Sequence, residues 1–318
     1  MRTNKKGLEF SFAWLFAIIV GAVILFMAIY SVKNLSEVGD ETSSTITGQR
    51  INVFFNILET GFESSSITYF TLPLKTRIYN DCDTKGYFGT QKFAISEFKR
   101  EKWSEPSGEG EFYNKYIFSE DFVEGTKFWL FTKPFEPLFK VNDYIYIIPE
   151  GTEYCFVDAP EEIEKEIENI NKSFMKIENH ASLDCDDDSI KVCFQGGDCD
   201  IEVDIKPDGG GSIKKDSETM YFIGDEEDNG MIFAGIFSSP EIYECQMKRM
   251  MKRMGILGDL YMQEINYVER VGCNSNVELR DLIEAAKDYE ESEDLYDVGQ
   301  EIKRIKGVYG DFHDCGIW

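Results

Sequence analysis

The chain has 318 residues, with 59 acidic against 33 basic side chains and a formal net charge of −26 at pH 7. A surface that binds nucleic acid needs basic groups to neutralise phosphates, so this balance argues against a nucleic-acid partner. It also argues against peripheral binding to an anionic membrane surface. The chain nevertheless contains 25 Phe and 16 Tyr, which indicate folded domains rather than disorder.

The first predicted element is an apolar run from Phe10 to Val32, which no charged residue interrupts. As a helix that rises ~1.5 Å per residue, it spans roughly 34 Å, enough to cross the ~30 Å hydrocarbon core of a bilayer. Basic residues stand in the short tail before it, and basic flanks of a first helix stay in the cytoplasm. We therefore predict a cytoplasmic stub at 1–9, a transmembrane helix at 10–32 in the cell membrane, and an extracellular remainder.

Two processing alternatives remain open for this segment. A cleaved secretory signal has an apolar core of about 7–15 residues and a small-x-small cleavage site, whereas this longer run ends in Tyr30-Ser31-Val32. Lys5-Lys6-Gly7 before the apolar run resembles the basic leader of type IV pilins and their archaeal relatives, although Phe12 stands where bacterial pilins carry Glu. That resemblance implies cleavage after Gly7 and an apolar helix that packs subunits into a filament.

The next segments predict a stalk and then a β-rich extracellular domain. Residues 33–65 read as the stalk, because Ile51, Phe54, Phe55 and Leu58 recur at helical spacing. From 66 to 238, short runs rich in aromatic and β-branched residues alternate with turns, as strands do. The polar stretch from Lys99 to Gly110 reads as an exposed loop.

Within this domain the sequence predicts one amphipathic helix near 160–176. Pro160 opens it, and an apolar face is formed by Ile163, Ile167, Ile170 and Phe174. Two further strands, at 190–194 and 199–205, flank Gly196-Gly197, which signals a hairpin. A second turn from 207 to 211 precedes another strand at 219–223.

Residues 239–318 predict a helical C-terminal unit, so the fold class is α+β. Ser239-Pro240-Glu241 is a helix-start signal, and a long helix is expected to run to about Arg270. Two shorter helices are expected at 277–289 and 293–305. The run from Gln246 to Met254 is Met-rich and basic. We interpret its methionines as core and its Lys and Arg as facing the acidic body.

The eight cysteines predict disulfides, because all lie on the expected outer side and their spacing fits no zinc motif. A straight helix from 240 to 270 separates Cys245 from Cys273 by roughly 37 Å, far beyond the ~5.5 Å that a disulfide spans. We therefore predict a Cys273–Cys315 bridge and a bond from Cys245 to the β-rich body, with Cys82–Cys155 as a weaker preference. The candidate disulfide residues are Cys82, Cys155, Cys185, Cys193, Cys199, Cys245, Cys273 and Cys315.

Motifs for catalysis, cofactors and metals are few. The sequence lacks the nucleophile elbow, the Walker A loop and the Rossmann fingerprint, and His180 and His313 are its only histidines. Acidic runs at 184–188 and 225–230 offer Ca²⁺ ligands, but the second lacks the bidentate Glu of an EF-hand because Ile236 takes its place. We predict no catalytic residue, no cofactor and no metal site.

Several segments resemble a group of uncharacterised single-span surface proteins from small-genome archaea. They are residues 9–19, 147–150 with 154–157, and 242–245 with 272–273. The resemblance implies an anchored, disulfide-bonded surface protein and carries no activity. We expect a protein that acts by contact with protein partners at the cell surface. The alternatives are a pilin-like filament subunit and, third, an extracellular enzyme that relies on carboxylates.

Overall fold

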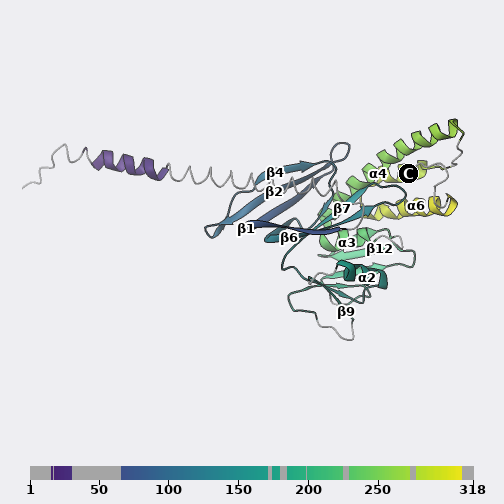
Figure 1. Ribbon diagram of the computed structural model, residues 1–318, viewed down its shortest axis with the longest axis horizontal. Coiled ribbons are helices and arrows are strands. Elements are labelled where there is room, and N and C mark those ends of the chain that lie inside the picture. The colour runs from purple at the N-terminus through teal and green to yellow at the C-terminus, as the bar shows by residue number, and fades with distance from the viewer. Residues whose placement is uncertain are drawn as a thin grey trace, which may run out of the picture.

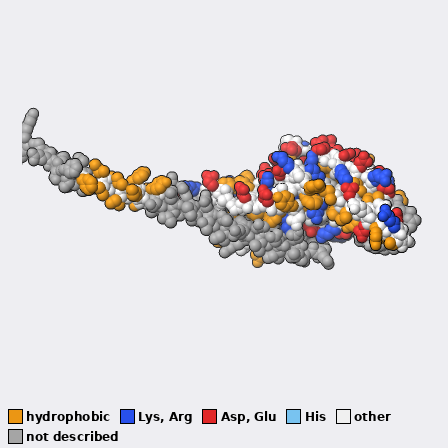
Figure 2. All heavy atoms as spheres, turned by 90° about the horizontal axis from the view of Figure 1, so that it is seen from above, with side chains coloured by type: hydrophobic (Ala, Val, Ile, Leu, Met, Phe, Trp, Pro, Cys, Tyr) orange, Lys and Arg blue, Asp and Glu red, His pale blue; other side chains and the backbone are white. Residues whose placement is uncertain are grey.

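The computed structural model describes residues 16, 18–30, 66–170, 174–179, 185–197, 199–224, 229–272 and 277–309. Residues 18–30 are helical, and every one of them is exposed (Figure 2). Among the described residues, no helix is both long and apolar enough to cross a bilayer. The predicted stalk and the rest of the run from Phe10 to Val32 lie outside the described residues, apart from Phe16.

The first sheet contains seven strands in the described part of the chain, in the order β3-β2-β1-β6-β7-β5, with β4 paired to β2 (Figure 1). Its neighbours are antiparallel except for β5 and β7. A register shift between Thr71 and Thr76 divides β1 into two halves. The strands are β1 (Ser66–Asp83), β2 (Thr90–Lys99), β3 (Lys102–Trp103), β4 (Ser107–Phe112), β5 (Ile117–Phe118), β6 (Phe122–Phe135) and β7 (Asn142–Pro149).

The second sheet contains six described strands in the order β13-β12-β11-β10-β8-β9. The ladders from β9 to β11 are parallel, and those from β11 to β13 are antiparallel. The strands are β8 (Tyr154–Val157), β9 (Met175–Glu178), β10 (Ile190–Cys193), β11 (Ile201–Ile205), β12 (Gly211–Lys215) and β13 (Glu218–Phe222).

Helix α2 (Glu161–Ile170) connects the parallel strands β8 and β9, and it corrects the predicted helix at 160–176. Ile163, Ile167 and Ile170 are buried along one face, as their spacing predicts. Phe174 is buried outside the helix, and Lys176 belongs to β9. The chain leaves the helix early because Met175–Glu178 pairs with β8, and these ladder bonds take precedence over the helical pattern.

Two other local predictions are wrong. The stretch from Lys99 to Gly110 is not a plain loop, because it contains β3 and part of β4. Arg100 and Glu101 form the two-residue turn before β3, both with positive φ (50° and 64°). The strands beside Gly196-Gly197 are neighbours but parallel, since β10 also pairs in parallel with β8.

The C-terminal part is helical, as predicted. Ser239 caps α4, and its hydroxyl accepts the backbone N–H of Ile242 at 3.4 Å. A helix that the sequence did not predict precedes it, and all its residues are buried. The helices are α3 (Gly230–Phe237), α4 (Pro240–Arg270), α5 (Arg280–Asp288), the short 3₁₀ helix η2 (Ser292–Asp294) and α6 (Leu295–Tyr309).

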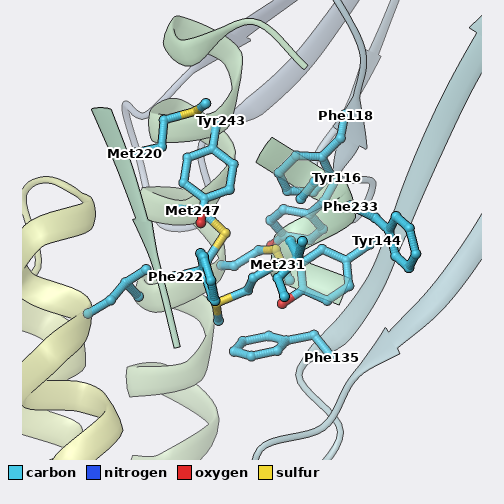
Figure 3. Close-up of a cluster of buried hydrophobic side chains, with 14 of the residues drawn as sticks. Tyr116, Phe118, Phe135, Tyr144, Met220, Phe222, Met231, Phe233, Tyr243 and Met247 are labelled. Atoms are coloured by element: carbon cyan, nitrogen blue, oxygen red, sulfur yellow. The ribbon is translucent and has the colours of Figure 1, made fainter. Parts of the chain in front are cut away.

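The unpredicted helix α3 is the centre of the main core, because it packs against both sheets (Figures 1 and 3). The ring of Phe233 lies 5.7 Å from that of Phe131 in the first sheet and 6.5 Å from Phe156 in the second. Phe237 bridges the sheets similarly, with Tyr146 at 5.8 Å and Tyr154 at 4.9 Å. These aromatic contacts join the two sheets into one body.

Candidate functional site

A cleft of about 830 Å³ lies where α2, α3, α6 and the turn between β11 and β12 meet. Ile163 of α2, Ile232 of α3 and Ile302 of α6 are buried and contribute apolar walls. Ile163 belongs to the apolar stripe of α2, whereas Ile232 belongs to α3, which is buried on all sides. The volume is within the ~300–1,000 Å³ range that is typical of ligand pockets.

Charged side chains of both signs also line this cleft. Lys303 on α6 donates from Nζ to the backbone oxygen of Asp208 at 2.7 Å and lies 3.4 Å from its carboxylate. Burial raises the pKa of the Asp208 carboxyl, but the charge and hydrogen bond of Lys303 outweigh it and hold that pKa below its ordinary value. Lys206 and Lys306 add positive charge, and Glu136 and Glu162 add negative charge.

An ion pair between a buried lysine and a half-buried glutamate lies beside the start of α3 and the cleft. Lys133, whose side chain is 7% exposed, pairs with Glu166 at 2.6 Å. The Glu166 carboxylate also accepts a hydrogen bond from Asn229 at 3.3 Å, and Asn229 lines the cleft just before α3. The cleft therefore combines apolar walls with charged side chains that ion pairs and hydrogen bonds fix in position. This arrangement suits the binding of an amphipathic group.

A second hollow, of about 350 Å³, lies between α5 and α6 and is lined by carboxylates. Arg304 pairs with Glu301 at 2.7 Å and with Asp281 at 3.5 Å. Asp294 accepts the backbone N–H groups of Glu290 and Glu291. Among the described residues, no group of three or more His, Cys, Asp or Glu is placed to hold a metal ion. The acidic lining residues are Asp281, Glu284, Asp288, Asp294, Asp297 and Glu301.

Among the described residues, three disulfides join six of the eight candidate cysteines. Cys82–Cys245 links β1 to α4 with a Cα–Cα distance of 6.1 Å, which confirms that Cys245 ties the helical unit to the β-rich body. The other bridges are Cys155–Cys185 and Cys193–Cys199.

The preferred pairing of Cys82 with Cys155 is wrong. Cys155 is buried in β8 of the second sheet, whereas Cys82 stands at the end of β1, beside α4. Cys273 and Cys315 lie outside the described residues, so their bridge stays a prediction.

The other predicted site residues are only partly described. Asp184 and residues 225–228 lie outside the described part of the chain, as do His180 and His313. Asp186 pairs with Lys176 at 2.6 Å, and this hydrogen bond and charge lower the pKa of its exposed carboxyl. Gly224 and Asn229, which flank the acidic run 225–228, both line the cleft.

The Met-rich basic run has the predicted core methionines, since Met247, Met250 and Met254 are buried. Its cations, however, mostly bind backbone oxygens rather than acidic side chains. Lys252 donates to the backbone oxygen of Thr84 at 2.7 Å, and Arg253 donates to that of Val141 at 2.8 Å. Lys248 is the exception and pairs with Glu290.

Sequence reasoning missed a buried polar junction centred on Arg249, which is fully buried. Its guanidinium donates to the backbone oxygens of Phe88 at 3.0 Å and Lys115 at 2.9 Å, and to the side-chain oxygen of Gln246 at 2.7 Å. It also stacks 4.6 Å from the ring centre of Tyr116. Burial lowers the pKa of Arg249 to about 10, so it remains charged at neutral pH. The sequence signal that could have indicated this junction is the presence of two polar residues, Gln246 and Arg249, within the buried stripe of methionines.

No protein-family model, curated protein or solved structure matches this chain.

Proposed function

We propose that this protein is anchored in the cell membrane by the apolar run 10–32 and presents its folded body outside the cell, where it acts by contact with other surface proteins. The observation that carries the proposal is the set of three disulfides that cross-link the body. Disulfides persist in oxidising compartments and are rare in the cytosol. The basic residues before the apolar run support the same orientation.

The cleft between α2, α3 and α6 supports a role in contact. Pro137, Ile205 and Ile223 line the cleft, are partly exposed and offer apolar surface for a partner's side chain. Lys206 and Lys306 offer charge for its polar groups. Recognition sites commonly combine an apolar floor with a few oriented polar groups.

Protease treatment of intact cells tests the topology. The chain beyond about Asn34 is expected to be digested while the membrane-embedded segment stays with the membranes after alkaline carbonate extraction. Protection of the body would place it in the cytoplasm and reject the proposal. Sequencing the mature N-terminus separates the filament alternative, because a new terminus at Leu8 would support pilin-like processing.

Site-directed cross-linking tests contact through the cleft. A photo-reactive residue in place of the exposed Lys306 is expected to yield discrete cross-linked products on intact cells. The same residue in place of Tyr87, which is 83% exposed and is not among the residues that line the cleft, serves as the control. Equal labelling at both positions, or none at Lys306, would argue against recognition in this cleft.

A further inference from the structure

One exposed face of the first sheet carries aromatic rings interleaved with cations. The guanidinium of Arg77 on β1 lies 4.5 Å from the ring centre of Trp103 on β3 and 4.6 Å from that of Phe122 on β6. Lys75 lies 5.6 Å from Trp103, and Tyr79 packs beside Phe122 at 6.2 Å. We call these five residues the aromatic–cation face. Its Phe122 is 46% exposed, so partner atoms can reach the rings.

The charge on this face is opposite in sign to the net charge of the protein. A single carboxylate, that of Glu124, pairs with both Lys75 and Arg77. The adjacent turn between β2 and β3 adds Arg100, Glu101 and Lys102, all exposed, so the face and turn together hold four cations against two carboxylates. The face and turn therefore hold a basic excess on a chain whose net charge is −26.

The hollow between α5 and α6 has the opposite charge. Six carboxylates line it, and Arg304 compensates for part of their charge. Strands β1 and β2 extend toward one end of the body in Figure 1, whereas α6 extends toward the other. The basic face and the acidic hollow are thus distinct surfaces on well-separated elements.

We propose that the aromatic–cation face of one copy docks in the acidic α5–α6 hollow of a second copy. This inference rests on the proposed contact function and names its partner as another molecule of the same chain. Because the two surfaces differ, the contact is head-to-tail, and it extends into a row of copies unless rotation closes it into a ring.

The balance of charges sets the conditions under which this contact forms. Two copies with the same large negative charge repel each other at long range. At 0.15 M salt the Debye length is about 8 Å, so long-range repulsion is largely screened while charges in direct contact still attract. The aromatic rings add apolar area, and Arg and aromatic residues are the types enriched at interfaces.

Charge reversal on each surface tests the contact, with sedimentation of the full chain in detergent micelles at 0.15 M salt as the measurement. One variant combines Lys75→Glu with Lys102→Glu, and the other combines Glu284→Lys with Asp288→Lys. Each is expected to weaken self-association about tenfold or more, since opposed charges become like charges. Lys165→Glu with Lys214→Glu matches the first variant in net charge and is its control, because both residues are exposed and lie on neither surface.

Mixing the two variants gives the decisive result. The reversed face of the first then matches the reversed hollow of the second, and their unaltered surfaces match too, so association is expected to return in the mixture. Failure to recover, an unchanged wild-type association in either variant, or an equal loss in the control would each overturn the proposal. Far-UV circular dichroism verifies folding, and Lys75→Gln with Lys102→Gln is the milder variant if the first pair misfolds.

This result is separable from the proposed location. The protease experiment reports where the body lies, whereas sedimentation reports only whether copies bind each other. A body found outside the cell whose variants associate like the wild type would reject the self-contact and leave the contact function standing.

Discussion

The two halves of α4 share one helix but have different surroundings. From Pro240 to Gly255 most side chains are buried, including the methionines of the core and Arg249. From residue 256 to Arg270 only Gly258 and Ile265 are buried, and Leu260 and Tyr267 are more than half exposed. The apolar stripe continues through both halves, so periodicity by itself does not determine which part of a long helix is packed.

The two halves of α4 differ in burial because they pack against different elements. The first half is joined to the first sheet by the Cys82–Cys245 bridge and by the hydrogen bonds of Arg249. The second half packs mainly on α5, and glycines allow the two helices to approach closely. A Cβ at Gly258 would lie 2.6 Å from a side-chain carbon of Ile283. Stability should therefore depend far more on substitutions in the first half.

The largest expected effect is from Arg249→Leu. The substitution leaves buried backbone oxygens of Phe88 and Lys115 without their donor, and we expect a loss of about 3–5 kcal/mol in the free energy of unfolding. Denaturant melts of the full chain measure it. Lys248→Leu is the neighbouring control, with an expected loss of under about 1 kcal/mol because its pair with Glu290 is at the surface. Equal losses of stability in the Arg249→Leu and Lys248→Leu variants would show that the buried hydrogen bonds of Arg249 do not stabilise the fold.

The next effect is from removing the long-range bridge. Cys82→Ala with Cys245→Ala should cost about 2–5 kcal/mol, because the bond restrains residues 163 positions apart in the unfolded chain. The Cys193–Cys199 bridge closes a much shorter loop, with a sequence separation of 6. Replacing both of its cysteines with Ala should therefore lower the free energy of unfolding by less. Thermal melts compare the two double variants, and the reverse order would contradict this account.

In the second half of α4, Gly258→Ala is expected to cost about 1–3 kcal/mol, because the added methyl group meets Ile283. Tyr267→Ala, at a side chain that is 66% exposed, should change stability by no more than about 0.5 kcal/mol. Urea melts of both variants make the comparison. A tolerated alanine at Gly258 would show that α5 does not pack as closely as described.

The smallest expected effect concerns Glu244, in the buried first half. Burial raises the pKa of its carboxyl, and the negative charges of Glu291 and Asp294 raise it further, against the hydrogen bonds from Ser292. The folded state therefore binds this proton more tightly than the unfolded state, so stability falls as pH rises through the raised pKa. Tyr289 and Tyr243 also face this carboxylate.

We therefore expect Glu244→Gln to raise the melting temperature slightly at pH 7 and to flatten its dependence on pH between the ordinary and the raised carboxyl pKa. Melts across that range measure the effect. Glu290→Gln, at the exposed pair with Lys248, is the control. A lower melting temperature for Glu244→Gln at neutral pH would mean that the ionised form stabilises the fold.

Local signals predicted much of this fold. The cap at Ser239, the long helix α4, the buried face of α2 and the link from Cys245 to the body follow from spacing and capping chemistry. Helix α3 was missed because a segment buried on all sides has no polar face to reveal a helical period.

The tertiary features could not be predicted in this way. The direction of β10 depends on β8, and the partner of Cys82 depends on where α4 crosses β1. The cleft joins side chains from α2, α3 and α6 that stand far apart in the sequence. No local sequence pattern indicates which of these distant side chains lie together, so the cleft can be identified only in the folded structure.

Non-reducing peptide mapping of the chain from its own cells, alkylated at lysis, tests the central claim most directly. The account predicts the linked peptides Cys82–Cys245, Cys155–Cys185 and Cys193–Cys199, together with the sequence-predicted Cys273–Cys315. Alkylated free thiols at Cys82 and Cys245 would contradict both the junction of α4 with the first sheet and the placement of the body outside the cell.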